Sequence, residues 1–356
     1  MIENGYEIDF IPVNSGERNG DAIAIRVRDN NVDTIYVIDG GTKESGQTLV
    51  DHIKENYNTN KVDYLINTHP DIDHSSGLTV VAEQLEIGEI WMHLPWDHAG
   101  EIIRSVLDKR VSENSLTRKL QKSLTQAKNL FDIAQANGIP IYEPFEGDSI
   151  GHFQVLSPSR NWYNELLLGF NNMPTADQET ALGTIMKSVK ETIRKVLENW
   201  NVETLTEDGE TSPQNESSCV LFGTFQDQNV LFTGDAGIQA LTRSIEYSQI
   251  IGIDLKQCHF VQIPHHGGRR NITPSILDEI IGPKLSQAVN ETKSAYANIS
   301  DGNSTHPKKS VSNAFKRRGA EVYVTKGIAA CHRKNFGTRS GWSNATSLPL
   351  FNEVEE

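Results

Sequence analysis

Hydrophobic residues in this chain occur mostly in short runs separated by polar and turn-forming residues. Near the N-terminus the runs read YEIDFIPV, AIAIRV, TIYVID and YLINT. Similar runs follow at IGEIWMHL, IPIYE, FQVLSP, CVLFGTF, VLFTGD, HFVQIP, SAYANIS and EVYVT. Short apolar or alternating runs between turn residues are typical of β-strands. We therefore predict strands in both halves of the chain, with helices that cover them at 78–85 and 308–318.

Two longer segments follow a helical pattern instead. In the first, 101–137, apolar residues recur mainly at helical spacing before the stop signal Gly-Ile-Pro; they are Leu116, Leu120, Leu124, Phe131 and Ala134. The second, from about 176 to 200, places on one helix face Ile185, Val189, Ile193, Val196 and Trp200. The acidic segment 203–216 after it predicts a mobile loop. Both blocks interrupt the strands, so they can form a lid or pack on the outer face.

The composition is that of a globular protein of enzyme size. The chain has 356 residues, of which 37% are hydrophobic and 22% charged, and this excludes a disordered or fibrous protein. No apolar run approaches the ~20 residues of a membrane helix, and the acidic N-terminus lacks a signal-peptide core, so we expect a cytoplasmic protein without a membrane segment. A net charge of -14 argues against a surface that is basic throughout, but not against a local basic groove.

The stretch THPDIDH, directly after an apolar run, carries two imidazoles and two carboxylates. They belong to His69, Asp71, Asp73 and His74. Such a density of histidine and carboxylate groups at a strand end is typical of metal ligands. The alternative is a polar turn that caps a helix, with Asp73 or Ser75 as N-cap, but histidine at both ends of a carboxylate pair is a poor choice for capping. We predict that these side chains bind two divalent ions ~3.5–4 Å apart.

Further ligands are expected at other strand ends. Asp235, in VLFTGDA, follows an apolar strand and is a candidate to bridge both ions. His265 and His266, in IPHHGG, are candidate ligands or proton donors, beside glycines that let the backbone approach closely. His306, in STHP, is a weaker candidate, because Xaa-His-Pro is also an ordinary loop sequence. No thiolate joins them, since the three cysteines lack CxxC spacing.

In this order, the motifs resemble those of the metallo-β-lactamase-fold hydrolases, and most closely the nuclease-like domain of the ComEC DNA-uptake proteins and their stand-alone relatives. NSGERNGDAIAI is similar to the opening strand, and VIDGG, with Asp39, is similar to the motif whose acid orients the metal loop through hydrogen bonds. Asp71 stands where the superfamily usually has a second histidine. Asn215, in QNESS, stands where many members have a histidine ligand, so it is expected beside the ligands, and His265 or His266 is a candidate to replace that histidine.

The resemblance implies an α/β fold, a four-layer αββα sandwich formed by a single domain over residues 1–356. Its two facing sheets come from the two halves of the chain, with helical insertions at about 101–138 and 165–214. The metal site lies at one edge of the sheets and holds two divalent ions as cofactors. Because the ligands are rich in carboxylates and lack thiolates, Mn²⁺ competes with Zn²⁺.

The activity implied is hydrolysis of phosphodiester bonds in DNA or RNA by a hydroxide held between the two ions. In this scheme Asp73 both binds metal and accepts the proton of the nucleophile. His265 or His266 protonates the leaving oxygen. Nucleic acid is therefore the expected substrate partner.

Basic residues near the last two histidine motifs are candidates to bind a substrate phosphate; they are Arg269, Arg270 and Lys308. The cluster at 316–318 is interpreted as solvated surface charge. Two other functions stay open. One is hydrolysis of a small phosphodiester or other ester, which the acidic net charge and a lid would suit. The other is a subunit of a bacterial multi-protein system that is inactive until its partner binds, for which the replaced histidine is the argument.

Overall fold

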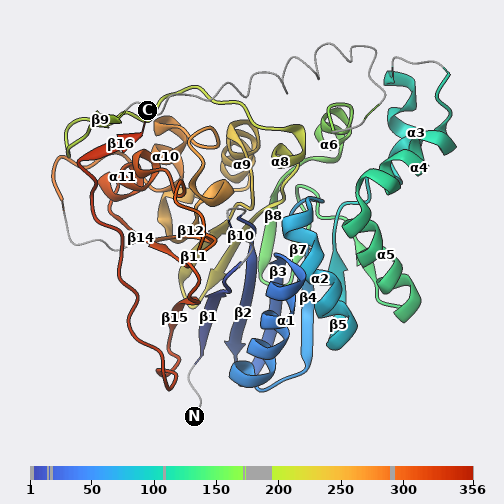
Figure 1. Ribbon diagram of the computed structural model, residues 1–356, viewed down its shortest axis with the longest axis horizontal. Coiled ribbons are helices and arrows are strands. Elements are labelled where there is room, and N and C mark those ends of the chain that lie inside the picture. The colour runs from blue at the N-terminus through green and yellow to red at the C-terminus, as the bar shows by residue number, and fades with distance from the viewer. Residues whose placement is uncertain are drawn as a thin grey trace.

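The computed structural model describes residues 4–13, 16, 19–106, 110–170, 173, 195–288 and 293–355. Within these ranges two seven-stranded sheets form the centre of the molecule (Figure 1). The first has the order β15 (Ala330–Lys334), β1 (Gly5–Phe10), β2 (Ala22–Asp29), β3 (Val32–Gly40), β4 (Lys61–Ile66), β5 (Glu86–Trp91), β6 (Ile141–Tyr142). The second has the order β14 (Ala320–Val324), β13 (Lys293–Ala297), β12 (Cys258–Gln262), β11 (Gln228–Phe232), β10 (Val220–Phe225), β8 (Phe153–Ser157), β7 (Ser149–Ile150). A separate pair joins β16 (Glu353–Glu355) to β9 (Lys195–Leu197).

Helices cover the outer faces of both sheets. Figure 1 shows on one side α1 (Lys43–His52), α2 (Ile72–Gln84) and α5 (Thr125–Asn137), and on the other α9 (Ile238–Ile250), α10 (Pro274–Ile280) and α11 (Lys309–Arg317). The remaining helical elements are η1 (Ile53–Tyr57), α3 (Ala99–Ile102), η2 (Ile103–Ser105), α4 (Glu113–Ser123), α6 (Arg160–Leu167), α8 (Pro213–Glu216), η3 (Leu255–Gln257) and η4 (Pro264–Gly267). The layers run helix, sheet, sheet, helix, so the predicted αββα sandwich is confirmed.

Strands that are apolar on both faces explain why the two sheets stack. In β3, Tyr36 and Ile38 belong to the core between the sheets, whereas Val37 packs with the helix-side core. β11 alternates in the same way, with Phe232 between the sheets and Leu231 on the helix side. Such double burial is expected of strands that lie between two covering layers. Burying one side chain of this size stabilises the fold by roughly 1.5–3 kcal/mol.

The first helical block forms α3, η2, α4 and α5, between β5 and β6. The residues predicted for its buried face are buried or partly buried, and they are Leu116, Leu120, Leu124, Phe131 and Ala134. α5 ends at Gly138, which adopts the left-handed conformation at φ 68° that favours glycine. α5 packs against α2 on the outer face of the first sheet, whereas α3 contacts α4 and α6.

Expectations for three other elements were wrong in part. α2 begins at Ile72 and not at 78, because the second half of the THPDIDH motif forms its first turn. Most of the helix expected at 176–200 lies outside the described residues, but its end is strand β9, so Val196 pairs with β16 instead of facing a helix core. Segment 203–216 ends in the short helix α8, which its sequence did not predict.

The two sheets do not come strictly from the two halves of the chain. β15, close to the C-terminus, adds to the first sheet beside β1 in antiparallel register. Tyr6 lies opposite Lys334 and Phe10 lies opposite Ala330. The sequence of β15, ACHRK, is too polar to be recognised as a strand from its pattern alone.

Candidate metal centre

Strand ends bring the predicted ligands to one edge of the two sheets. In the first sheet, β3 carries Asp39, and the loop after β4 carries His69. In the second sheet, Asp235 follows β11, and η4, with His265 and His266, follows β12. β3 runs parallel to β4, and β11 runs parallel to β12. The carboxyl ends of parallel strands lie at the same edge of a sheet, so side chains far apart in the sequence meet there.

Asp235 lies at the centre of these side chains. Its Oδ2 atom is 3.4 Å from Nε2 of His74 and 3.5 Å from Nε2 of His265. The same oxygen is 3.9 Å from Nε2 of His69. The second oxygen, Oδ1, is 3.6 Å from Nε2 of His266. His265 is the most exposed of the five, with 38% of its side chain accessible.

These distances and the burial of the atoms fit bound metal ions. Zinc–nitrogen and zinc–oxygen bonds of about 2.0–2.2 Å at a tetrahedral angle place the nitrogen and oxygen about 3.4 Å apart. Among the side chains around Asp235, four buried atoms have no hydrogen-bond partner in the described residues; they are Nε2 of His69, Nε2 of His74, Oδ1 of Asp235 and Nδ1 of His266. Buried polar atoms rarely stay unpaired in a folded protein. The donor set therefore fits divalent metal.

A hydrogen-bond network from Asp39 determines which nitrogens face the centre. The carboxylate accepts hydrogen bonds from the backbone N–H of Thr68 (2.8 Å), the Thr68 hydroxyl (2.6 Å) and Nδ1–H of His74 (2.7 Å). Because the Thr68 hydroxyl gives its hydrogen to Asp39, its oxygen accepts from Nδ1–H of His69, at 3.1 Å. Both imidazoles therefore keep the lone pair on Nε2, which faces Asp235.

Two overlapping groups of side chains lie close enough to hold metal. One consists of Asp21, His74, Asp235 and His266, and the other of Asp39, His69 and His74. The oxygens of Asp39 already accept several hydrogen bonds, so this residue suits the role of an acceptor that orients ligands, as its motif predicts.

Asp21 was missed as a site residue, although it stands in the motif NGDAIAI. It is buried, accepts a hydrogen bond from Nε2 of Gln262 (2.9 Å) and lies 3.7 Å from Nδ1 of His266. Burial raises the pKa of Asp21 well above its usual range, and the Asp235 carboxylate adds to the rise against the opposite effect of His74. An acid directly before a buried apolar strand was the available sequence signal.

Asp235 shows the opposite shift. Burial alone would raise its pKa, but the imidazoles of His265, His74 and His266 hold the pKa of this carboxyl well below its usual range. The Asp235 carboxylate is therefore charged at neutral pH. Asp73 lies in the first turn of α2, where its backbone contacts Gly20, and it is not part of either metal group.

Asp71 is held by a residue that the sequence did not single out. Nε2 of Gln214, in α8, donates to Oδ1 of Asp71 at 2.7 Å, and Oδ2 of Asp71 lies 3.7 Å from Nε2 of His69. The predicted neighbour Asn215 instead pairs with the Ser212 hydroxyl at 2.7 Å, at the N-terminus of α8. The contact between Gln214 and Asp71 joins residues 143 positions apart, so the sequence carried no signal for choosing Gln214 over Asn215.

His306 lies outside both metal groups. Its Nδ1 atom pairs with the Thr305 hydroxyl at 3.0 Å, and burial, with Lys308 and His265 nearby, lowers its pKa to about 4. Lys308 lies at the start of α11, where its backbone N–H donates to the carbonyl of Gly267 at 3.0 Å. The turn with the two histidines is thus tied directly to the loop that carries His306.

The arginines expected to bind phosphate face an acidic segment. Arg270 lines a hollow of about 530 Å³ together with Glu207, Asp208, Gly209, Glu210 and Ile238. A hydrogen bond with the Thr206 side chain and one with a backbone N–H lower the pKa of Asp208, and the charge of Arg269 lowers it further. Acidic side chains therefore lie beside the positive charges that follow the histidine pair.

The sequence indicated that the basic cluster at 316–318 is solvated surface charge, but the structure shows these side chains buried. Arg317 is fully buried, pairs with Glu198 at 2.8 Å and donates to the carbonyls of residues 199, 200 and 202. Arg318 pairs with Glu203 and Asp278, both at 2.7 Å. These arginines hold the segment 198–203 and have partners within the protein.

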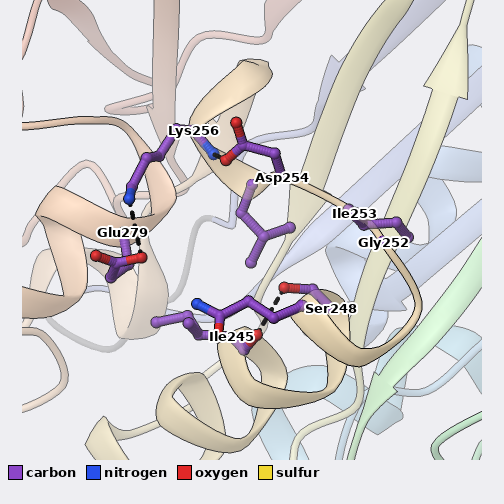
Figure 2. Close-up of a pocket in the computed structure, with 9 residues that line it drawn as sticks. Ile245, Ser248, Gly252, Ile253, Asp254, Lys256 and Glu279 are labelled. Atoms are coloured by element: carbon purple, nitrogen blue, oxygen red, sulfur yellow. Dashed lines mark hydrogen bonds and ion pairs between the residues drawn. The ribbon is translucent and has the colours of Figure 1, made fainter.

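A second hollow, of about 260 Å³, lies away from the candidate centre (Figure 2). It is formed by the end of α9, the turn that follows and α10, and its lining includes Ser248, Asp254, Lys256 and Glu279. Lys256 and Glu279 form an ion pair of 3.0 Å across it. Its lining contains none of the predicted ligands, all of which are among the described residues.

Among the described residues, no helix has the length and apolar character to cross a membrane.

Comparisons with known proteins show which sequences and structures this chain is similar to. Residues 15–153 match the sequence model of the metallo-beta-lactamase superfamily. A comparison with curated proteins gives no match. Among solved structures, the chain is similar to a mutant of the CmlA beta-hydroxylase, with 12% identity over 94% of this chain and 54% of that one, at a TM-score of 0.42.

Two further structures show similarity of the same order. A long form of RNase Z from yeast is 12% identical over 92% of this chain and 42% of its own, at a TM-score of 0.41. A diphosphatase from the PhnP family is 8% identical over 94% of this chain and 99% of its own, at a TM-score of 0.39. The chain spans about half the length of the CmlA and RNase Z structures. The sequence match is confined to residues 15–153, and the two facing sheets and the order of the motifs agree with the fold that the resemblance implied.

Proposed function

We propose that the protein is a metal-dependent hydrolase that cleaves phosphodiester bonds, with DNA or RNA as the first candidate substrate. The observation that carries the proposal is the arrangement around Asp235, where Nε2 of His74 and of His265 lie 3.4 and 3.5 Å from one carboxylate oxygen. Bound divalent ions would lower the pKa of a water molecule and stabilise negative charge on a phosphoryl oxygen. The phosphodiester class comes from the resemblance of the motifs to the ComEC-type domain.

The residues of the chain divide the work in this proposal. His69, His74 and Asp235 hold metal through the atoms that face the centre, and Asp71 completes the set from its position beside His69. We assign to Asp73 the acceptance of the proton from the attacking water, since its charge acts on Asp21, which belongs to one of the two metal groups. We also assign His265 and His266 to metal binding, because Nε2 of each lies 3.5 or 3.6 Å from an oxygen of Asp235.

The metal that best suits this set is a second part of the proposal. Imidazole nitrogens suit Zn²⁺, whereas carboxylate oxygens also suit Mn²⁺. Asp71 and Asp235 supply oxygens beside the imidazoles of His69 and His74, and Asp71 takes the place that an imidazole has in the resemblance. We propose two divalent ions, with both Zn²⁺ and Mn²⁺ to be tested.

A small phosphodiester is the second candidate substrate, and the acidic hollow favours it. Glu207, Asp208 and Glu210 lie beside Arg270 and give this face negative charge. A long polyanion is repelled by such a surface, whereas a small ester, especially one with a positively charged group, is not.

The test is a paired assay of the purified chain with its metal content measured. Wild type and a His69→Ala/Asp71→Ala variant are incubated with single- and double-stranded DNA, with RNA and with bis(p-nitrophenyl) phosphate, each with Mn²⁺ or Zn²⁺. Cleavage of nucleic acid by wild type alone supports the nuclease proposal. Cleavage of the small ester with intact nucleic acid supports the second candidate. Failure of wild type to bind either ion overturns both.

A further inference from the structure

Asn271 is a buried amide that links two of the proposed ligands. It is 1% exposed and follows the turn with the two histidines. Its Nδ2 atom donates to the backbone carbonyls of Asp235 (3.1 Å) and Ala236 (3.2 Å). Its Oδ1 atom lies 2.9 Å from Nδ1 of His265. One side chain therefore joins the end of β11 to the turn after β12.

The orientation of this amide determines the tautomer of His265. The two carbonyls accept hydrogen bonds only from the NH₂ group, because a flipped amide would place its oxygen against both of them. Oδ1 of Asn271 must then accept from Nδ1–H of His265. The lone pair of His265 consequently lies on Nε2, the atom 3.5 Å from Oδ2 of Asp235.

The turn that Asn271 holds is conformationally strained. His265 and His266 both adopt left-handed backbone angles, with φ of 47° and 57°. A residue other than glycine is strained in this region and keeps the conformation only where its surroundings enforce it. Gly268 leaves room for the contact, since a Cβ atom there would lie 2.9 Å from Oδ1 of Asn271 and 3.1 Å from Nδ1 of His265.

We propose that Asn271 is a positioning residue of the metal centre, which fixes His265 and Asp235 at the separation that a shared ion requires. It contacts no substrate and binds no metal itself. The inference rests on the proposed function, because it assumes that His265 and Asp235 bind metal. Hydrogen-bond partners of ligands typically change metal affinity 10- to 100-fold when removed.

The experiment measures the affinity of the metal-free full-length chain for Zn²⁺ and Mn²⁺, by competition with a chelating indicator. We expect Asn271→Ala to weaken binding about 10- to 100-fold. The matched control is Asn313→Ala, in α11. Asn313 is equally buried and takes part in three hydrogen bonds, with Glu198 and with the backbone N–H and carbonyl of Phe351. We expect this control to lower the melting temperature and to leave metal affinity unchanged.

Gly268→Ala is the second variant, and it tests the same contact in case Asn271→Ala does not fold. It keeps both polar groups but pushes Asn271 away from His265, so we expect it to weaken metal binding as well. Wild-type affinity in Asn271→Ala and Gly268→Ala would overturn this inference and leave the proposed function intact. Absence of metal binding in wild type would overturn both. Equal loss of affinity in the Asn313→Ala control would also overturn the inference, because it would show a general effect of instability.

Discussion

At the scale of single residues, Asp39 sets the chemistry of two imidazoles without facing the centre itself. It accepts from His74 directly and from His69 through the Thr68 hydroxyl. Its own conformation is unusual, with φ of 55°. Strained backbone at a buried acid is consistent with a functional need to orient its carboxylate, which outweighs the loss of stability.

We predict that Asp39→Asn weakens binding of Zn²⁺ or Mn²⁺ about 10- to 100-fold. The new NH₂ group would face the donor hydrogens of the Thr68 hydroxyl and His74, so His74 would have to move its proton to Nε2 and lose its lone pair there. Chelator competition measures the change. Asp63→Asn, which removes the charge of a carboxylate bonded to the backbone of Ile35, is the control and should bind metal normally. Normal binding by both variants would contradict the role of Asp39.

His93 is a second residue whose surroundings decide its protonation. It is 3% exposed, stacks on Tyr163 with ring centres 4.2 Å apart, and neither ring nitrogen has a hydrogen-bond partner among the described residues. Burial lowers the pKa of His93 to about 3. Below the ordinary pKa of about 6.5, His93 is protonated in the unfolded chain but stays neutral in the folded chain. The contribution of His93 to stability therefore falls as the pH falls from 6.5.

We predict that His93→Phe reduces this acid sensitivity, because phenylalanine keeps the stacking and cannot bind a proton. Relative to wild type, the free energy of unfolding of the variant should rise by about 2 kcal/mol between pH 7.5 and pH 5, from 1.36 kcal/mol per pH unit below 6.5. Urea denaturation of the metal-free proteins at both pH values measures it. Parallel pH profiles of the two proteins would show that His93 titrates normally.

At the scale of secondary structure elements, α11 serves as an anchor for the segment 198–203. Arg317 on this helix is fully buried and binds both the Glu198 carboxylate and three backbone carbonyls. A buried charge without its partner costs several kcal/mol, so the pair must stay together. The pair therefore holds the residues after β9 against α11.

We predict that Arg317→Met lowers the free energy of unfolding by about 3–5 kcal/mol, because it leaves Glu198 buried without its partner. The double variant Arg317→Met/Glu198→Gln should recover part of the loss, since it removes the unpaired charge as well. Denaturation in guanidinium chloride measures both. A double variant that is less stable than the single one would contradict this explanation.

The sequence predicted elements well where the signal was local and poorly where a distant partner decided the structure. Apolar runs followed by histidine or acid placed His69 and Asp235 at strand ends correctly. Arg317 was interpreted as surface charge because its partner, Glu198, lies 119 residues away. The same reason hid Gln214 and Asn271, whose polar side chains look ordinary until the fold brings them to Asp71 and Asp235.

At the scale of the whole molecule, charge opposes the expected polyanionic substrate. The chain has a net charge of -14, and the acidic segment with Glu207, Asp208 and Glu210 lies beside the arginines that follow the histidine pair. Acidic groups around a site reduce the local concentration of polyanions, and salt screens the effect over about 10 Å at 0.1 M. Substrate choice therefore depends on this segment as well as on the metal ligands.

We predict that Glu207→Gln/Asp208→Asn/Glu210→Gln increases binding of DNA several-fold at low salt and by less at high salt, because it removes three negative charges beside Arg269 and Arg270. Turnover of bis(p-nitrophenyl) phosphate, a small phosphodiester with a single negative charge, should change little. Fluorescence anisotropy across a salt series measures binding. The control neutralises exposed acids away from the centre, Asp51, Glu55 and Glu86. An equal gain in this control would show an effect of net charge alone.

The pairing of β1 with β15 has a consequence for how the chain is made. Strand β1 leaves the ribosome more than 300 residues before its partner, since Tyr6 pairs with Lys334. During that interval one edge of the first sheet has unpaired backbone groups, and such edges promote association between chains. We expect newly synthesised chains to associate more readily until β15 pairs with β1. A shortened version that ends before Ala330 leaves β1 itself as the edge strand.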